Sequence, residues 1–206
     1  MIGVVSIGMG NVPSIRSMFD RLDVPLQLVD SLGSMEKVST LILPGVGSFD
    51  NGVSSLVKGG WVNALREFAQ EKTVVGICLG MQLLLDESDE GNLTGLELIR
   101  GRSSHLTKLG EQVVPNVGWR TIVATHHTSP SLRKVLESNR FYFSHSYGVV
   151  TESTRMHLGF VGENERVLAA IQNGNIFGFQ FHPERSQRGG LELFRWLSLR
   201  DNNEVQ

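Results

Sequence analysis

The first half of the chain alternates short β-type runs with helical patterns, and this alternation limits its fold more than any other feature. Runs rich in Val, Ile and Leu lie at 4–7, 26–29, 40–43 and 73–77. Helical patterns follow the first run, occupy about 61–71 after a glycine-rich loop, and begin again at Leu79. Strands separated by helices pair in parallel, because the chain crosses over the sheet between them. We therefore expect an α/β fold with an open, mostly parallel central sheet and helices on both faces.

The second half has a different pattern, in which strand-like segments follow one another with short connections. These segments lie at 95–99, 113–115, 120–123, 140–146, 167–172 and 176–181, and a helical pattern near 131–137 interrupts them. This order predicts an antiparallel or mixed extension of the same sheet. A final helix over 190–199 should close the fold, and the tail 201–206 should fray. Since no repeat or linker divides the chain, we expect residues 1–206 to form a single domain.

Charge and composition narrow the classes of partner. The 19 Lys and Arg residues stand against 21 Asp and Glu residues, so no positive excess favours nucleic acid or an anionic membrane. The N-terminal sequence lacks the features of a signal peptide and no apolar run is long enough to span a bilayer, which favours the cytoplasm. There a single cysteine would stay reduced. Small ligands or another protein are the expected partners, without a metal or a cofactor.

The single cysteine, Cys78, lies in the sequence Gly-Ile-Cys-Leu-Gly, where a β-type run gives way to a helical pattern. Ligands of open parallel sheets bind at the carboxyl ends of the strands. Gly76 and Gly80 permit the tight strand-to-helix turn that presents a nucleophile, and the Leu79 N–H would then be an oxyanion donor. This motif alone favours a nucleophile no more than a buried structural cysteine.

A partner for the thiol is present in the segment IFGFQFHPE, which ends at Glu184. Its phenylalanines alternate to one face of a strand and leave His182 on the other. Pro183 favours an extended backbone at His182, so His182 and Glu184 can project to the same side. The carboxylate could then hold the imidazole in the tautomer that accepts the thiol proton. Four further histidines lie in polar or weakly patterned surroundings and are expected at the surface or in loops: His105, His126, His127 and His157.

The pairing of GICLGMQLL with FQFHPE resembles the class I (triad) glutamine amidotransferases, and the resemblance covers nearly the whole chain. The segments PGVGSF (44–49), PNVGW (115–119), SHSY (144–147) and HPERS (182–186) are similar to one branch, the glutaminase subunits of imidazole glycerol phosphate synthase in histidine biosynthesis. The resemblance implies a flavodoxin-like fold. It also implies hydrolysis of L-glutamine to glutamate and ammonia through a cysteine thioester.

Residue roles follow from matching this sequence to the motifs of the family. The resemblance implies that Cys78 is the nucleophile, His182 the general base and acid, and Glu184 its orienting partner. It implies an oxyanion strand at 44–47, in which the Val46 amide joins that of Leu79 after a peptide turns. The glycines on either side, Gly45 and Gly47, make such a rotation of the peptide easy. The positions that match contacts to the glutamine head group are Gln82, Glu90, Ser146 and Tyr147.

The family pairs this subunit with a (β/α)8-barrel cyclase in a heterodimer, and ammonia reaches the cyclase through a shielded channel. That cyclase makes imidazole glycerol phosphate and aminoimidazole carboxamide ribotide. The positions expected at the interface are Asn11, Asn116, Trp119, Arg120, Tyr142 and Arg185.

Three other interpretations stay open. The family usually has Pro-His-Met-Gly-Trp-Asn where this chain has PNVGWR at 115–120, and relatives in surface-polysaccharide pathways supply ammonia to a cyclase-like synthase that modifies a sugar. A non-catalytic binding module on the same fold is the second. The third is a dinucleotide site, suggested by GMG at 8–10 and Asp30, although Pro13 stands in place of the third glycine.

Overall fold

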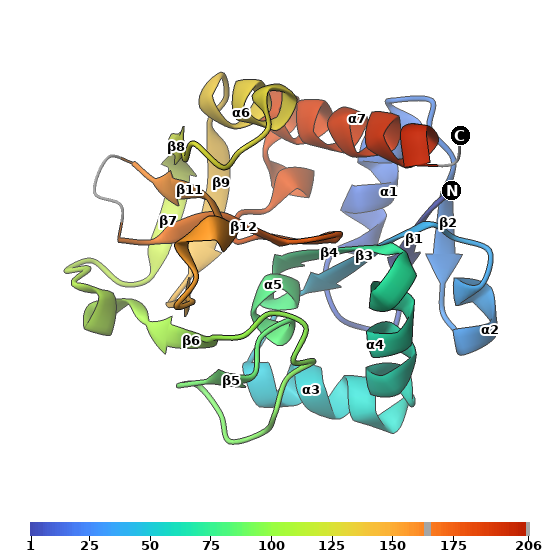
Figure 1. Ribbon diagram of the computed structural model, residues 1–206, viewed down its shortest axis with the longest axis horizontal. Coiled ribbons are helices and arrows are strands. Elements are labelled where there is room, and N and C mark those ends of the chain that lie inside the picture. The colour runs from blue at the N-terminus through green and yellow to red at the C-terminus, as the bar shows by residue number, and fades with distance from the viewer. Residues whose placement is uncertain (163–165, 205–206) are drawn as a thin grey trace.

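Eight strands form a central sheet in the computed structural model, which describes residues 1–162 and 166–204 (Figure 1). Their order across the sheet is β2 (Leu26–Val29), β1 (Ile2–Val5), β3 (Thr40–Gly45), β4 (Thr73–Cys78), β13 (Ile176–Phe179), β12 (Leu168–Asn173), β11 (His157–Val161) and β8 (Ile122–Ala124). The first five run parallel, and the last three continue the sheet in antiparallel pairs. The parallel part has the flavodoxin-like strand order. The predicted α/β class and its mixed extension are confirmed.

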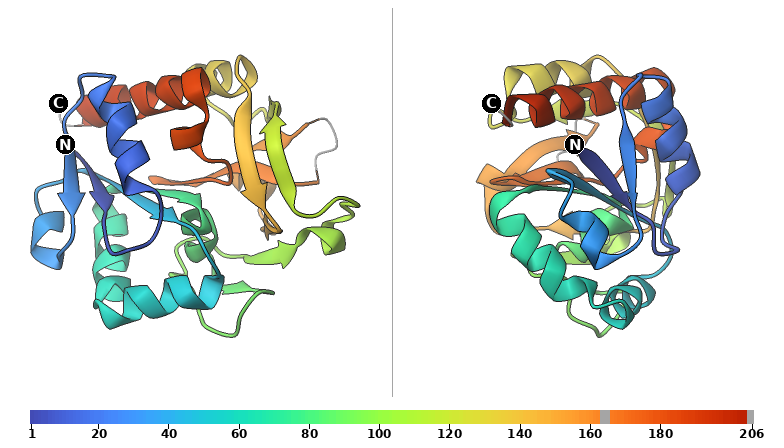
Figure 2. Two further views of the ribbon diagram at one scale, coloured as in Figure 1. Left: turned by 180° about the vertical axis from the view of Figure 1, so that it is seen from behind. Right: turned by 90° about the vertical axis from the view of Figure 1, so that its right-hand side faces the viewer.

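Helices cover both faces of this sheet (Figures 1 and 2). One face carries α1 (Val12–Asp20), α6 (Pro130–Glu137) and α7 (Gln187–Glu204), and the other carries α3 (Phe49–Lys58), α4 (Trp61–Glu71) and α5 (Leu79–Leu83). A short helix, α2 (Leu32–Met35), follows β2. Within the described part of the chain, no helix combines the length and the apolar character needed to cross a bilayer.

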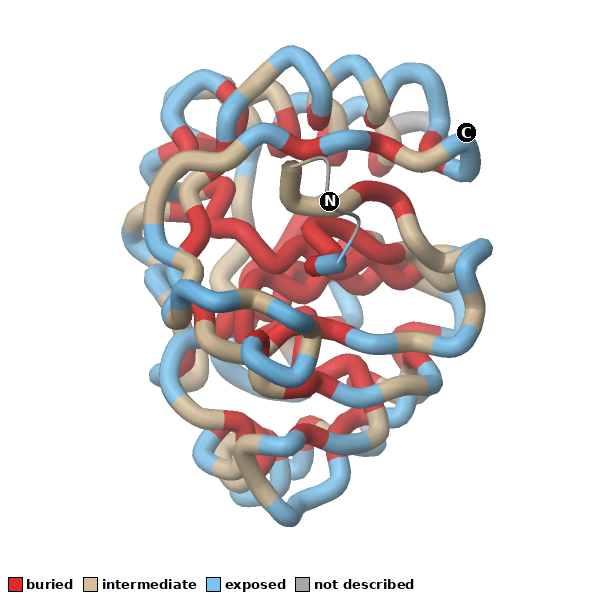
Figure 3. The backbone as a smooth tube through the Cα atoms, turned by 90° about the vertical axis from the view of Figure 1, so that its left-hand side faces the viewer, coloured by how far each residue is buried: buried red, intermediate tan, exposed pale blue. Residues whose placement is uncertain are grey.

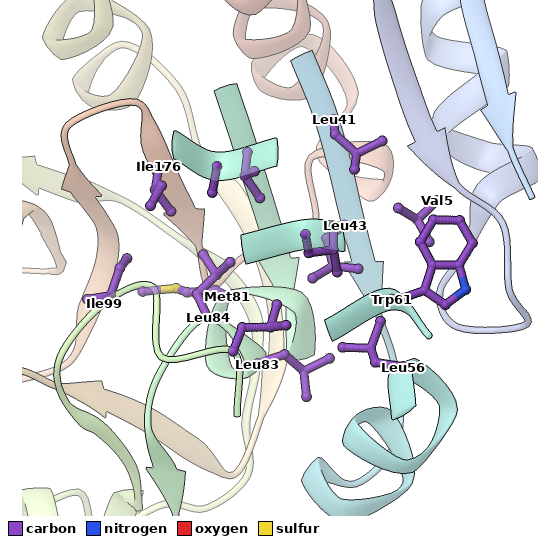
Figure 4. Close-up of a cluster of buried hydrophobic side chains, with 14 of the residues drawn as sticks. Val5, Leu41, Leu43, Leu56, Trp61, Met81, Leu83, Leu84, Ile99 and Ile176 are labelled. Carbon is purple, nitrogen blue, oxygen red and sulfur yellow. The ribbon is translucent and has the colours of Figure 1, made fainter. Parts of the chain in front are cut away.

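The apolar core consists of two clusters, one on each face of the sheet, so the strands are buried in the centre of the molecule (Figure 3). Successive residues of β3 show why: Leu41 and Leu43 pack with Trp61 and Leu83 beneath the sheet, whereas Ile42 belongs to the opposite cluster (Figure 4). The side chains of Leu41, Ile42 and Leu43 are fully buried. A strand covered on both faces needs apolar residues at every position, which produces the continuous Val, Ile and Leu runs of the first half.

Two smaller sheets lie beside the central one. The prediction that the strands of the second half all extend the central sheet is therefore wrong in part. One contains β10 (Tyr147–Val150), β6 (Arg102–His105) and β5 (Glu87–Ser88); the other pairs β7 (Asn116–Arg120) with β9 (Phe141–His145). The strand predicted at 140–146 therefore exists but does not join the central sheet. Instead, it pairs antiparallel with β7, and Asn116 lies opposite His145.

Some predicted strands do not form. At 95–99, the backbone amides of Leu96 and Ile99 donate to Leu83 and Leu84 at the end of α5, so the apolar pattern reflects packing beneath that helix. Residues 113–115 form no strand either, and Val113 is 77% exposed. In the first half, α3 was not predicted by the pattern of its sequence.

The tail predicted to fray is ordered at its start, because α7 continues to Glu204. Asp201 is buried and accepts hydrogen bonds from the hydroxyls of Ser39 (2.8 Å) and Thr40 (2.7 Å). It also forms an ion pair with the N-terminal amine of Met1 at 2.9 Å. These contacts join the last helix to the edge where β1 and β3 begin. Residues 205–206 lie outside the described part of the chain.

Candidate active site

The turn between β4 and α5 holds Cys78 in a conformation that is rare outside glycine. Cys78 has φ 54° and ψ −112°, and its side chain lies where the strand ends and the helix begins. A Cβ at Gly80 would lie 1.9 Å from the Leu43 carbonyl oxygen, and one at Gly76 would lie 2.6 Å from the Gly80 oxygen. Both glycines are therefore needed for the helix to approach the sheet this closely. Such strain is concentrated at functional sites.

The pairing of β4 with β13 brings His182 to the cysteine. The two strands are parallel and adjacent, with Phe179 opposite Ile77, so the segments that follow them leave the sheet at the same edge. His182 forms a hydrogen bond with the Cys78 side chain, and its Nδ1 lies 2.9 Å from Glu184 Oε1. Cys, His and Glu side chains from two distant segments thus form one hydrogen-bonded array.

The electrostatic surroundings favour a protonated imidazole at His182. Burial lowers the pKa of His182, but hydrogen bonds to Cys78 and Glu184 and the negative charges of these two groups outweigh burial and raise it to about 10. The side chains of His182 and Glu184 are only 7% and 3% exposed. Glu184 Oε2 is buried without a hydrogen-bond partner in the described residues, so its charge is directed chiefly at the imidazole. The array suits transfer of the thiol proton to His182.

A cavity of about 410 Å³ opens above the sulfur. Its lining includes many of the residues selected from the sequence: Val46, Gly47, Cys78, Leu79, Gln82, Glu90, Ser146, Tyr147, His182 and Arg185. Glu184 and Gly45 do not line it: Glu184 is hydrogen-bonded to His182 Nδ1, and Gly45 is the last residue of β3, packed against Leu79 and Gly80.

The loop after β3 has the freedom that a turning peptide requires. Val46 is 54% exposed, and Gly47 has φ +107°, a value that residues with a side chain rarely adopt. A Cβ at Gly45 would lie 2.7 Å from the Gly80 amide nitrogen and 2.8 Å from the Leu79 Cβ. The loop is thus anchored against the Cys78 turn at Gly45 and free at Val46 and Gly47.

Two of the four expected head-group residues, Gln82 and Glu90, are held by hydrogen bonds within the fold. Gln82 donates to the Tyr147 carbonyl (3.1 Å) and to Gln180 Oε1 (3.2 Å), and Gln180 in turn directs its amide nitrogen to Cys78 Sγ at 3.8 Å. Glu90 accepts a hydrogen bond from the Phe49 amide at the start of α3 (2.8 Å). Gln82 and Glu90 are therefore fixed in place at the cavity wall before any ligand is bound.

The residues expected at the partner interface are brought together only in part. Trp119 and Tyr142 oppose each other on β7 and β9 with ring centroids 6.0 Å apart, and the Arg185 guanidinium lies 4.1 Å from the Tyr142 ring centroid. Arg120 donates to the main-chain oxygens of Trp119 and Val117, each at 3.2 Å.

Asn11 has a structural function of its own. Its Oδ1 accepts a hydrogen bond from the Ser14 amide and so caps the N-terminus of α1. This cap accounts for the residue type without a partner.

Two further residues of the site did not emerge from the sequence. Gln180 is fully buried and contacts the sulfur; the only sequence signal was its position on the same strand face as His182. His145 lines the cavity and is 6% exposed. Burial lowers the pKa of His145 to about 4, although the hydrogen bond to the Tyr147 carbonyl acts to raise it. The alternation of buried Phe141 and Phe143 along β9 indicates the buried side on which His145 lies.

The other histidines lie away from the cavity. His126 and His127 are exposed in a turn, as predicted, whereas His105 and His157 are half-buried in strands. In the described part of the chain, no group of His, Cys, Asp and Glu side chains is arranged to hold a metal ion.

Comparison with known proteins identifies the family of the chain. The family model for class-I glutamine amidotransferases matches residues 7–196. The "Imidazole glycerol phosphate synthase subunit HisH 2" of Pseudomonas aeruginosa is 38% identical over 95% of this chain and 97% of its own. The "Imidazole glycerol phosphate synthase subunit HisH" of a Geobacillus species is 40% identical over 95% and 94%, respectively.

Solved structures share the fold at lower sequence identity. A crystal structure of a glutamine amidotransferase has a TM-score of 0.73 at 15% identity over 98% of both chains. The structure of PurLQS from Thermotoga maritima has a TM-score of 0.71 at 18% identity over 97% of both chains. The family model and the two HisH relatives each span nearly the whole chain, and this protein therefore belongs to the class-I glutamine amidotransferase family.

Proposed function

We propose that this chain is the glutaminase subunit of an imidazole glycerol phosphate synthase. It hydrolyses L-glutamine to glutamate and delivers the ammonia to a cyclase subunit. Relatives with this name match the chain over nearly its full length. The observation that carries the proposal is the hydrogen-bonded array of Cys78, His182 and Glu184 at a cavity of about 410 Å³.

The proposed reaction begins with proton transfer from the Cys78 thiol to His182. The sulfur attacks the side-chain amide carbon of glutamine, and the resulting oxyanion accepts hydrogen bonds from the Leu79 N–H and, once its peptide turns, from the Val46 N–H. His182 then protonates the leaving nitrogen, and the C–N bond breaks. Ammonia departs, and a glutamyl thioester on Cys78 remains. Glu184 holds the imidazole in orientation throughout.

Hydrolysis of the thioester completes the cycle. His182, now neutral, takes a proton from water, and the oxygen attacks the thioester carbon. The C–S bond breaks, glutamate is released and the thiol is restored. Gln82, Glu90, Ser146 and Tyr147 are proposed to hold the amino-acid head group of glutamine, since all four line the cavity.

The proposed partner is a (β/α)8-barrel cyclase, bound as a heterodimer through the face that carries Trp119, Tyr142 and Arg185. The edge-to-face contact of Trp119 with Tyr142 and the position of Arg185 over the Tyr142 ring support a common surface. Asn11, Asn116 and Arg120 are included in this proposal. Ammonia is protonated in bulk water, so a direct contact between the subunits is needed to deliver it in the reactive form.

One observation favours keeping a second candidate, a paralogue that supplies ammonia to a sugar-modifying synthase. The half-buried Arg120 forms no ion pair with a carboxylate in the described residues and bonds only main-chain oxygens. A charge covered at an interface without a counter-ion is strongly unfavourable, so Arg120 selects partners that supply an acidic group or leave it in water.

Reconstitution tests the proposal directly. The protein is mixed with the histidine-pathway cyclase from the same source and N'-phosphoribulosyl formimino ribotide, and glutamate and imidazole glycerol phosphate are measured together. We expect equal release of both from glutamine. In the control, Cys78→Ala should abolish the glutamine-dependent reaction and leave the ammonia-dependent synthesis by the cyclase intact.

Each of the other outcomes has a distinct meaning. Glutamine hydrolysis by Cys78→Ala would exclude Cys78 as the nucleophile. No complex and no stimulation with the cyclase would favour the sugar-modifying paralogue. An inactive wild-type chain that still binds its partner would favour the non-catalytic binding module.

A further inference from the structure

A continuous chain of hydrogen bonds links the outside of β7 to the sulfur of Cys78. It begins at Asn116, whose Nδ2 lies 3.0 Å from His145 Nε2, and continues from His145 Nδ1 to the Tyr147 carbonyl oxygen at 2.8 Å. The same carbonyl accepts from Gln82, Gln82 donates to Gln180, and Gln180 contacts the sulfur. None of these bonds passes through the oxyanion strand, so this route to the nucleophile is separate.

The chemistry of each member fixes the direction of the hydrogen bonds. A carbonyl oxygen can only accept, so the proton of His145 must lie on Nδ1, facing Tyr147. In the neutral imidazole, Nε2 then has no proton and needs a donor. The Asn116 amide supplies that donor. The Gln82 amide nitrogen donates to the Tyr147 carbonyl and also to the Gln180 oxygen. This orients the Gln180 amide with its oxygen toward Gln82 and its nitrogen toward Cys78.

His145 lies at the point where this chain meets the cavity wall. It ends β9, and its bond to the Tyr147 carbonyl spans the connection to β10. Ser146 and Tyr147, which that connection carries, both line the cavity. A buried imidazole bonded across the turn restricts its backbone, because two residues of main chain are fixed by one side chain.

Asn116 is reachable from the other side. It is half-buried, and with Val113, Arg120 and Val161 it lines a second cavity of about 220 Å³, whereas His145 lines the one above Cys78. Asn116 and His145 are directly opposed in the β7–β9 pair, and their side-chain contact joins the lining of the outer cavity to the lining of the active site. A group entering the outer cavity can therefore contact the donor of His145 without entering the active site.

We propose that His145 is a positioning residue for the glutamine-binding turn and that Asn116, by donating to the unprotonated Nε2, holds the imidazole ring in the required orientation from the partner face. A hydrogen-bond acceptor of the partner, such as a carboxylate or a carbonyl oxygen, that competes for the Asn116 amide loosens the turn at Ser146 and Tyr147. The position of Asn116 thus couples partner binding to glutamine affinity. The inference rests on the proposed glutaminase function.

The test compares three variants in the complex with the cyclase. Asn116→Leu keeps the approximate size and removes the donor, Asn116→His restores an N–H donor, and Asn63→Leu makes the same change on the exposed surface of α4 as a control. Loss of one hydrogen bond of ordinary strength predicts a KM for glutamine raised about fivefold, with kcat changed less than about twofold. Asn116→His should bring KM back toward the wild-type value, and Asn63→Leu should not change it.

Nitrogen-15 NMR measures the chemical shifts of the imidazole nitrogens, which report hydrogen bonding at His145 and would not change if Asn116 only supported the fold. Wild type, Asn116→His and Asn116→Leu should all show His145 as the Nδ1–H tautomer, because the Tyr147 carbonyl fixes it. The Nε2 resonance should have the same position in wild type and Asn116→His, and in Asn116→Leu it should shift to that of a nitrogen without a hydrogen-bond donor. Unchanged KM and an unchanged His145 spectrum in Asn116→Leu would overturn the inference, as would a raised KM that Asn116→His fails to restore. A wild-type chain that releases no glutamate overturns the proposed function instead, and the spectra then decide the Asn116–His145 bond alone.

Discussion

Replacing Gly80 by alanine tests whether the close approach of α5 to β3 holds the nucleophile in place. The added Cβ would lie 1.9 Å from the Leu43 carbonyl oxygen, whereas ordinary contact begins at 3.4 Å. The Leu43 oxygen belongs to the backbone, and no side-chain torsion can move a Cβ away from it, so the helix must shift from the strand by about 1.5 Å, the difference between the two distances. Forcing such a shift in a packed interior typically costs about 1–3 kcal/mol.

The expected net effect is a loss of about 1 kcal/mol in the free energy of unfolding, because a steric cost of about 2 kcal/mol, the middle of that range, is offset by about 1 kcal/mol from the higher helix propensity of alanine. For a chain of this length that corresponds to a decrease of about 2–4 °C in Tm. The activity should fall further, since a misplacement of about 1 Å at a reacting group can cost about 100-fold in rate.

The assay combines thermal unfolding with glutamine hydrolysis in the presence of the partner. Gly33→Ala is the matched control, because Gly33 lies in the helix α2 with nothing within 4 Å of its added Cβ. That variant should keep the wild-type activity and be no less stable. Wild-type activity and an unchanged Tm in Gly80→Ala would refute the argument that steric contact at this turn sets the position of Cys78.

Two other variants test the carboxylate at the end of α7 and the loop after β3. Burial raises the pKa of Asp201, but hydrogen bonds from Thr40, the N-terminal amine and Ser39 outweigh it and leave the pKa below its ordinary value. Stability from a lowered pKa is present above the unfolded pKa and is lost as the pH falls through the folded one. Urea unfolding should therefore find Asp201→Asn less stable by roughly 1–3 kcal/mol at pH 7, a difference that narrows in acid below about pH 4. Gly47→Pro, whose ring excludes the observed φ of +107°, should keep only basal glutaminase activity, and stimulation by cyclase and ligand that survives this change would contradict a turning peptide at Val46.

The parts of the fold that sequence predicted well are those fixed by local patterns. The strand at 26–29 and the helix at 61–71 agree with the structure to the residue, because a short apolar run and a helical period each specify their own element. The turn at Cys78 was also predictable, since two glycines around one cysteine leave few other conformations.

What the sequence could not predict depends on contacts between distant segments. Helix α3 contains Gly52 and several residues with low helix propensity, and it forms because Phe49 and Leu56 are buried in the core. The side-chain contacts of His145 with Asn116 and of Gln180 with Cys78 join residues that lie far apart in the chain. No local pattern carries that information.

The position of β13 constrains how the chain is made. This strand comes near the end of the sequence yet lies in the middle of the sheet, between β4 and β12. While the chain emerges from the ribosome, β4 therefore presents an unpaired apolar edge until nearly all residues have been synthesised. His182 arrives with the same strand, so an incomplete chain contains the thiol without its base. Catalytic competence and protection against aggregation are thus acquired in one late step of folding.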